Sequence, residues 1–176
     1  MDLRIVKTKK VIKEAFLTLR KKYPLEKVKV KDICDLALIN KTTFYKYYLD
    51  VFDLSAELED EAIEQFFSAS KDMDCLFSAP EKFVAGIPKS VDENIKPVTA
   101  LFARREDVFM KKMEHWLLDF YKRNNSDMSI EDEVKLHFVI CGATHTMQEM
   151  TTHRPKDETA IADCIFRCAS RICTAK

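Results

Sequence analysis

The sequence predicts an all-α protein, and three observations lead to that prediction. Only two glycines, Gly86 and Gly142, occur among 176 residues, whereas folds rich in tight turns and phosphate-binding loops need several. Apolar residues recur every three or four positions along most of the chain, which is the period of an amphipathic helix. Hydrophobic residues make up 47% of the chain and charged residues 33%, enough for both a buried core and a solvated surface.

The first predicted element is a helix that ends near Lys22. Apolar residues recur at helical spacing and lysines occupy the other faces; the apolar residues are Ile5, Ile12, Ala15, Phe16 and Leu19. Pro24 disfavours a helical conformation at the residue before it, and this sets the expected end of the helix.

A short helix, a tight turn and another short helix are predicted next. Apolar spacing indicates a helix over 30–37, and Leu38-Ile39-Asn40 breaks it. Asn40 is a favourable N-cap for a helix that begins at Lys41. This order is typical of a helix-turn-helix motif, whose last helix enters the major groove of DNA. The alternative is an ordinary three-helix subdomain with an aromatic core.

Charge is divided unevenly along the chain. Residues 1–50 contain 13 Lys and Arg against 6 Asp and Glu, a net charge of +7, and residues 51–176 contain 16 against 23, a net charge of −7. A basic N-terminal segment suits a polyanionic partner, although a solvated lysine-rich surface is the simpler explanation of the lysines alone.

Three segments, 8–19, 28–34 and 39–54, resemble the N-terminal domain of TetR/AcrR-family transcriptional regulators in order and spacing. The most specific part is the block Thr43-Phe-Tyr-Lys-Tyr-Tyr after an Ile-Asn turn. The resemblance implies a helix-turn-helix DNA-binding domain over 1–50 and a helical ligand-binding and dimerisation domain over 51–176. It also implies the DNA-binding residues, which are Thr8, Lys41, Thr42, Thr43, Tyr45, Lys46 and Tyr47.

Two positions depart from the family pattern. Leu38 stands where the family usually has a glycine in the turn, so a bulky residue is expected in a conformation that glycine tolerates better. Val51 stands where a lysine usually opens the fourth helix, which removes one phosphate contact.

Five further helices are predicted after residue 50. A fourth helix is expected over 53–71, and the Ser78-x-x-Glu81 spacing of a capping box predicts another that starts near Ala79. Patterned segments then predict helices that end near Asn124, run from Ser129 to about Thr152, and occupy 157–174 after the break at Pro155.

The last two helices carry apolar columns suited to close helix packing. TetR-like proteins dimerise through this pair, so the resemblance implies a homodimer. The alternative is that both helices complete the core of one chain. The expected interface residues are Phe138, Cys141, Ile161, Cys164, Ile165, Cys168 and Ile172.

The resemblance also implies an apolar cavity for an unidentified small-molecule effector, which aromatic and methionine side chains of the C-terminal half could line. The alternative is that each of these side chains is an ordinary core residue. Phe83 and Phe109 are additional candidates for the wall of the cavity. The residues expected to line it are Phe102, Met110, Met113, Trp116, Phe120 and Met147.

Histidines and cysteines of the last two helices have a spacing that could also form a metal site. His137, Cys141 and His145 follow each other at i, i+4 and i+8, and Cys164 and Cys168 form a second i, i+4 pair that could complete a site if the two helices face each other. Interface packing explains the same residues, so we expect no metal and no cofactor. No nucleophile elbow, HExxH motif or catalytic triad is evident, so catalysis is not expected.

The longest stretch without Asp, Glu, Lys or Arg, Leu136 to Gln148, has 13 residues and is too short to span a bilayer. With no evident signal peptide we expect a cytoplasmic location and reduced cysteines. The basic N-terminal segment and the family resemblance together predict a ligand-responsive homodimeric regulator that binds double-stranded operator DNA. Repression is the commonest mode in that family, and activation is the alternative. The alternative function is a helical protein-interaction module with the same fold and weak or lost DNA binding.

Overall fold

The computed structural model describes residues 3–68, 101–125 and 127–174. Throughout these ranges the regular structure is helical and no strand occurs, which confirms the all-α prediction. The expected helix near Ala79, its Ser78–Glu81 capping box and Phe83 lie outside the described residues. None of the described helices is both long enough and apolar enough to cross a membrane.

The described residues form two compact units. The first contains residues 3–65 and 101–106, and the second contains residues 66–68 and 107–174. The segment 101–106 therefore belongs with the N-terminal helices, although almost 40 positions separate it from residue 65 in the sequence.

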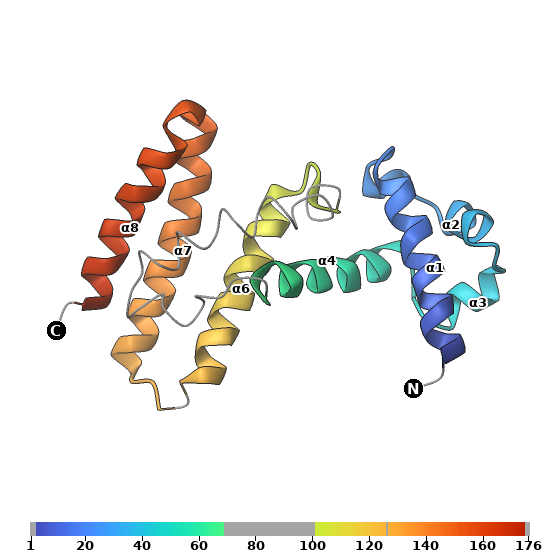
Figure 1. Ribbon diagram of the computed structural model, residues 1–176, viewed down its shortest axis with the longest axis horizontal. Helices are drawn as coiled ribbons and strands as arrows, with labels where there is room; N and C mark the ends of the chain where they lie inside the picture. The colour runs from blue at the N-terminus through green and yellow to red at the C-terminus, as the bar shows by residue number, and fades with distance from the viewer. Residues whose placement is uncertain (1–2, 69–100, 126, 175–176) are drawn as a thin grey trace. The chain divides into compact units, whose positions relative to one another are not determined.

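The first unit begins with α1 (Leu3–Arg20), η1 (Leu25–Lys27), α2 (Val30–Ala37) and α3 (Lys41–Tyr45) (Figure 1). The predicted bounds of α2 and the predicted start of α3 are confirmed. The core of this unit contains Ile12 and Phe16 of α1, Ile33 of α2 and Phe44 of α3, each fully buried. The apolar face predicted for the first helix is therefore its core face from Ile12 to Leu19, whereas Ile5, predicted on the same face, is 42% exposed.

Helix α4 (Val51–Ser68) begins two residues earlier than the sequence predicts. The carboxylate of Asp50 accepts from the Asp53 N–H at 2.8 Å, and the carboxylate of Asp53 accepts from the Leu49 N–H at 2.9 Å. These two bonds satisfy backbone donors at the start of the helix. Val51 is 6% exposed and packs in the core, which explains an apolar residue at this position.

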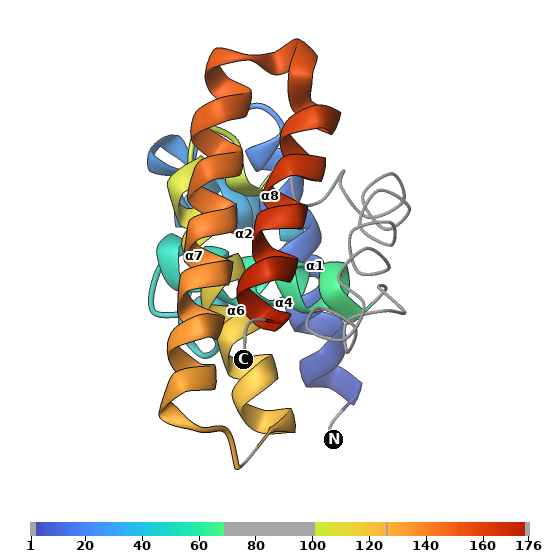
Figure 2. The same cartoon turned by 90° about the vertical axis from the view of Figure 1, so that its left-hand side faces the viewer.

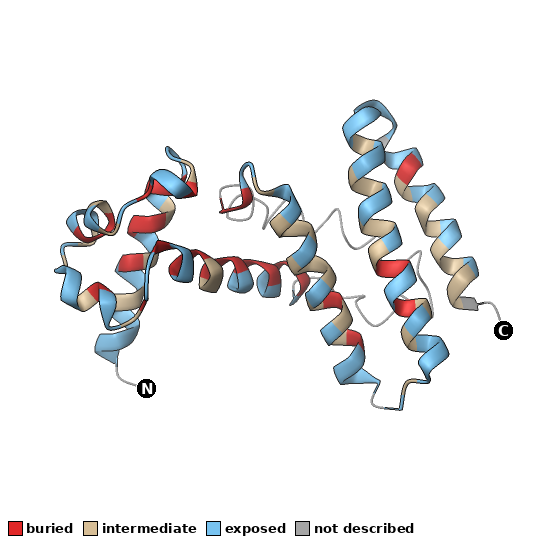
Figure 3. Ribbon diagram, turned by 180° about the vertical axis from the view of Figure 1, so that it is seen from behind, coloured by how far each residue is buried: buried red, intermediate tan, exposed pale blue. Residues whose placement is uncertain are grey.

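The second unit contains α6 (Glu106–Asn124), α7 (Ile130–His153), η3 (Pro155–Asp157) and α8 (Glu158–Thr174). The Ser129 hydroxyl caps α7 by accepting from the Asp132 N–H at 3.1 Å. Helices α7 and α8 lie side by side and run antiparallel (Figure 2). Along α8 most positions are exposed or half-buried, and Ile161 is buried (Figure 3).

Candidate nucleic-acid interface

Helix α3 is short, and its two ends are fixed by different means. At its start the Asn40 side chain accepts from the Thr43 N–H at 2.7 Å and from the Thr43 hydroxyl at 2.9 Å. On its inner side Phe44 is fully buried, with its ring 5.5 Å from that of Tyr45 and 5.7 Å from that of Tyr48. A five-residue helix is too short to be stable alone, so this cap and this anchor hold its outer face in place.

Asn40→Ala should destabilise the first unit by about 1 kcal/mol, because it removes the N-cap of α3. Urea unfolding followed by circular dichroism measures this change. Asn40→Asp keeps the side-chain acceptor and should restore most of the lost stability. Equal unfolding of Asn40→Ala and the wild type would show that the cap contributes nothing.

Four of the predicted DNA-binding residues point away from the core. The side chains of Lys41, Thr42, Tyr45 and Lys46 are exposed on α3 and just after it. We call these four residues the outer face of α3. Two cations, a hydroxyl and a phenol are groups that can donate hydrogen bonds to phosphate oxygens.

The remaining predicted DNA-binding residues are less available for contact with phosphate. Thr43 and Tyr47 are half-buried, and the hydroxyl hydrogen of Thr43 is engaged by Asn40. Thr8 is also half-buried, and its hydroxyl donates to the Arg4 carbonyl one turn earlier in α1 at 2.8 Å. A contact from Thr8 or Thr43 to phosphate therefore requires a rotation of its hydroxyl group.

Two lysines of α1 are occupied by the acidic side chains of α4. The Lys9 ammonium lies 2.9 Å from the Glu57 carboxylate, and the Lys13 ammonium contacts the carboxylates of both Glu57 and Glu61. Tyr48 adds a hydrogen bond from its hydroxyl to Glu57 at 3.2 Å. The basic character of the sequence thus overstates the charge that this part of the unit can offer to a polyanion.

Ionisation in this cluster is set by burial and by the paired charges. Burial alone would raise the pKa of Glu57, but the hydrogen bonds and charges of Lys13 and Lys9 outweigh it, and the net shift is downward. Burial likewise opposes the charged form of Lys13, yet Glu57 and Glu61 raise its pKa overall. For Tyr48, burial first and the Glu57 charge second raise the pKa. Lys13 and Glu57 therefore stay charged, and the phenol stays protonated.

The turn between α2 and α3 contains a non-glycine residue in a left-handed conformation. Leu38 has φ 54° and ψ 43°, as the sequence pattern predicts for a residue in the place of a glycine. Its N–H and that of Ile39 both donate to the Cys34 carbonyl, which closes α2. The Leu38 side chain is 91% exposed.

The first unit contains a buried polar connection that was not predicted from the sequence. The Arg20 side chain is 4% exposed, and its guanidinium donates to the carbonyls of Tyr23 and Leu101, each at 2.8 Å. Glu59, 2% exposed, accepts from Ser55 and forms an ion pair with Arg105. A signal was present for Arg20, which follows the buried Phe16 by four positions and so lies on the same helix face.

The residues predicted to line an effector cavity are divided between the units. Phe102 is buried in the first unit, whereas Met110, Met113 and Met147 are half-buried in the second. Trp116 and Phe120 come together in a continuous aromatic stack. The Trp116 ring lies parallel to the ring of Phe67 of α4 at 4.3 Å and to that of Phe120 at 5.2 Å.

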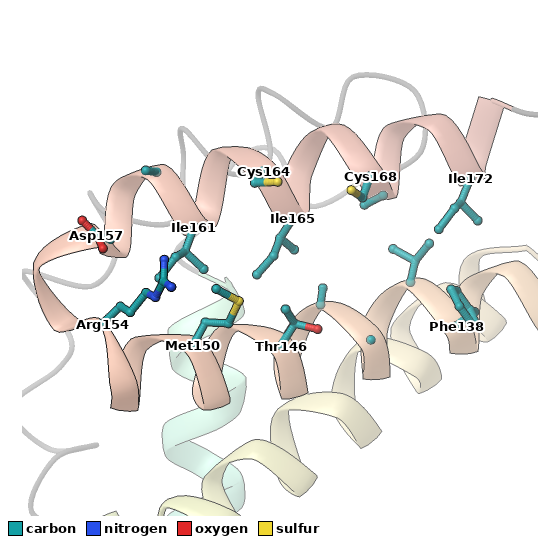
Figure 4. Close-up of a pocket in the computed structure, with 15 residues that line it drawn as sticks. Phe138, Thr146, Met150, Arg154, Asp157, Ile161, Cys164, Ile165, Cys168 and Ile172 are labelled. Atoms are coloured by element: carbon teal, nitrogen blue, oxygen red, sulfur yellow. The ribbon is translucent and has the colours of Figure 1, made fainter.

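An apolar groove of about 510 Å³ runs between α7 and α8 (Figure 4). Ile161, Ile165 and Ile172 extend from α8 toward α7 along its length. Phe138, on the α7 side, is 67% exposed. Six of the predicted interface residues line this groove and Cys141 does not; the six are Phe138, Ile161, Cys164, Ile165, Cys168 and Ile172.

The cysteines of the described ranges have free thiols. Burial and the Glu114 charge raise the pKa of Cys141, whereas Cys164 and Cys168 are exposed on α8. Within the part of the chain that the structure describes, no three His, Cys, Asp or Glu side chains are grouped so that they could hold a metal ion. The i, i+4 pairs predicted from the sequence are therefore not brought together as a metal site there.

No protein-family model matches the sequence, and a search of curated proteins finds no significant relative.

Proposed function

We propose that this protein is a DNA-binding transcriptional regulator in which α2, Leu38–Asn40 and α3 act as a helix-turn-helix motif. The observation that carries the proposal is the outer face of α3. Lys41, Thr42, Tyr45 and Lys46 are exposed there, while Phe44 and the Asn40 cap fix the helix from the other side. The face thus presents charge and hydroxyl donors from a rigid support, as phosphate positioning requires.

The protein acts as a homodimer in this proposal. Along its groove with α7, helix α8 carries two exposed cysteines and the half-buried Ile165 and Ile172, and Phe138 on the α7 side is mostly exposed. A second copy that packs its own α7 and α8 against this face would bury that apolar surface by two-fold symmetry. Two reading helices related by a two-fold axis recognise two half-sites about one DNA turn apart.

A small apolar effector would regulate DNA binding. The adaptable methionines of α6 and the aromatic stack around Trp116 are the groups that would respond to such a molecule. The chain just before α6 is held in the first unit by the Arg20–Leu101 and Arg105–Glu59 contacts. Displacement of that segment on effector binding would change DNA affinity, and DNA would change effector affinity by the same factor. Repression is the simplest outcome.

One observation favours the alternative, a protein-interaction module. Leu49 is 83% exposed and Phe52 is 56% exposed at the start of α4, beside the proposed reading helix. Exposed apolar side chains of this size are more typical of a protein contact than of a phosphate contact. Duplex binding distinguishes the two functions.

The test is selection of bound duplexes from a random-sequence pool, followed by fluorescence anisotropy of the selected duplex over a salt series. The protein should bind the selected duplex at least a thousandfold more tightly than a scrambled one, about the lower limit for specific regulators. Affinity should fall linearly with the logarithm of salt concentration.

Lys41→Gln and Lys46→Gln should each reduce the magnitude of the slope of log affinity against log salt concentration by about 2, because a dimer loses two phosphate contacts. Lys22→Gln is the matched control, since Lys22 is exposed after the far end of α1. It removes the same charge and should leave the slope unchanged. Failure to enrich any duplex would refute DNA binding and leave the interaction module as the better function. Equal effects of all three substitutions would mean that α3 does not face the DNA.

A further inference from the structure

Leu38 combines two features that a turn residue does not ordinarily combine. It occupies the left-handed region with φ 54°, and its side chain, at 91% exposure, is the most exposed large apolar group in the described residues. Glycine or asparagine would close α2 at lower conformational cost. The packing of the first unit gains almost nothing from the leucine side chain.

The backbone around Leu38 is held firmly. The N–H groups of Leu38 and Ile39 both donate to the Cys34 carbonyl, and Asn40 is fixed as the cap of α3. The leucine side chain therefore projects from a rigid turn and would lose little backbone entropy on meeting a ligand. Strained residues held in this manner are concentrated at binding sites.

Charge identifies the partner of this side chain. Exposed lysines lie on both sides of Leu38 in the chain, Lys29 and Lys31 at the start of α2 and Lys41 and Lys46 at α3. Leu38 is three residues before Lys41, next to the N-terminal end of the helix that is proposed to enter the major groove. In that groove the apolar feature of a base edge is the C5-methyl group of thymine.

We propose that Leu38 is a specificity-determining residue that contacts the methyl group of one thymine in each half-site. This inference rests on the proposed DNA-binding function. It adds an apolar contact that reads sequence to the phosphate contacts of the lysines, which carry no sequence information by themselves.

The test replaces single thymines by uracil in the duplex selected by the wild-type protein. This replacement removes one methyl group and leaves base pairing intact. Each half-site should contain one thymine whose single replacement lowers the wild-type affinity about fourfold. This is the value of one buried methyl or methylene group. Leu38→Ala should bind the thymine duplex more weakly and should not distinguish uracil from thymine at that position. Leu38→Met, which keeps a long apolar chain, should retain the distinction.

Leu38→Gly separates binding from folding. It relieves the left-handed strain, so its urea midpoint should be no lower than that of the wild type, while its DNA affinity should fall as in Leu38→Ala. A wild-type protein that binds its duplex but is insensitive to uracil at every thymine would overturn this inference and leave the proposed function standing. The same holds if Leu38→Ala keeps the wild-type sensitivity. If the wild-type protein enriches no duplex, the proposed function fails, and the inference fails with it.

Discussion

Phe138→Arg is expected to convert the proposed dimer into monomers. Phe138 is 67% exposed in the single chain, so its replacement should leave the second unit folded. In a two-fold interface each substitution occurs twice. Loss of two buried phenylalanines costs about 4 kcal/mol, which raises the dissociation constant about a thousandfold. The desolvation of two guanidinium groups adds to this cost. Sedimentation equilibrium measures the change directly.

Asp163→Arg provides the control for charge on the same helix pair. Asp163 is exposed on α8 and is not among the residues that line the groove. The arginine there should leave the dimer intact and thus show that position, rather than added charge, decides the outcome. A wild-type protein that sediments as a monomer would refute the dimer. A Phe138→Arg protein that still dimerises like the wild type would move the interface to another surface.

Local chemistry explains why much of the first unit could be predicted from sequence. Asn40 is a strong N-cap, and the start of α3 at Lys41 follows from it. The left-handed conformation of Leu38 follows from its position at the end of α2. The first helix ends at Arg20, two residues earlier than predicted. There the Lys22 N–H donates to the Leu19 carbonyl, a bond with the tighter spacing of a 3₁₀ helix.

Contacts between distant residues could not be predicted in the same way. Lys9 and Lys13 read as free surface charge in the sequence, yet their partner Glu57 is 48 and 44 positions away. Apolar spacing identifies which face of a helix is buried but not which acidic side chain lies opposite a lysine. For the same reason the polar positions of α3 could be named from the sequence, but neither the partial burial of Thr43 and Tyr47 nor the charge left available around the helix could be predicted.

The extent of the first unit could not be predicted from the sequence either, because it also depends on contacts between distant residues. Residues 101–106 belong to it, partly because Arg20 donates to the Leu101 carbonyl, 81 positions away. The position of Arg20 four residues after Phe16 indicates the core face of α1, but no pattern in the sequence identifies the carbonyls to which it donates. Its role becomes visible only when both carbonyl acceptors are placed.

Arg20→Ala is expected to destabilise the first unit by about 3 kcal/mol. The substitution removes two charge-assisted hydrogen bonds and leaves the Leu101 carbonyl without its guanidinium donor. Burial, and secondarily the charge of Arg105, lower the pKa of Arg20, yet a guanidinium stays protonated at neutral pH and so keeps its donors. Urea unfolding followed by circular dichroism should show a part of the helical signal lost at lower denaturant concentration.

Two variants sharpen this measurement. Lys22→Ala removes an exposed cation two residues away and should change the stability by less than about 0.5 kcal/mol. Arg20→Lys keeps the charge but lacks the planar fork that reaches two carbonyls at once, so it should lie between Arg20→Ala and the wild type.

Trp116, the single tryptophan of the chain, lies in the second unit, and its fluorescence reports on that unit separately. An early circular dichroism transition in Arg20→Ala without an early fluorescence transition would place the damage in the first unit, as expected. Coincident transitions at the wild-type midpoint would mean that solvent replaces the guanidinium at little cost. The buried arginine would then contribute nothing to the attachment of residues 101–106, and regulation through that segment would lose its physical basis.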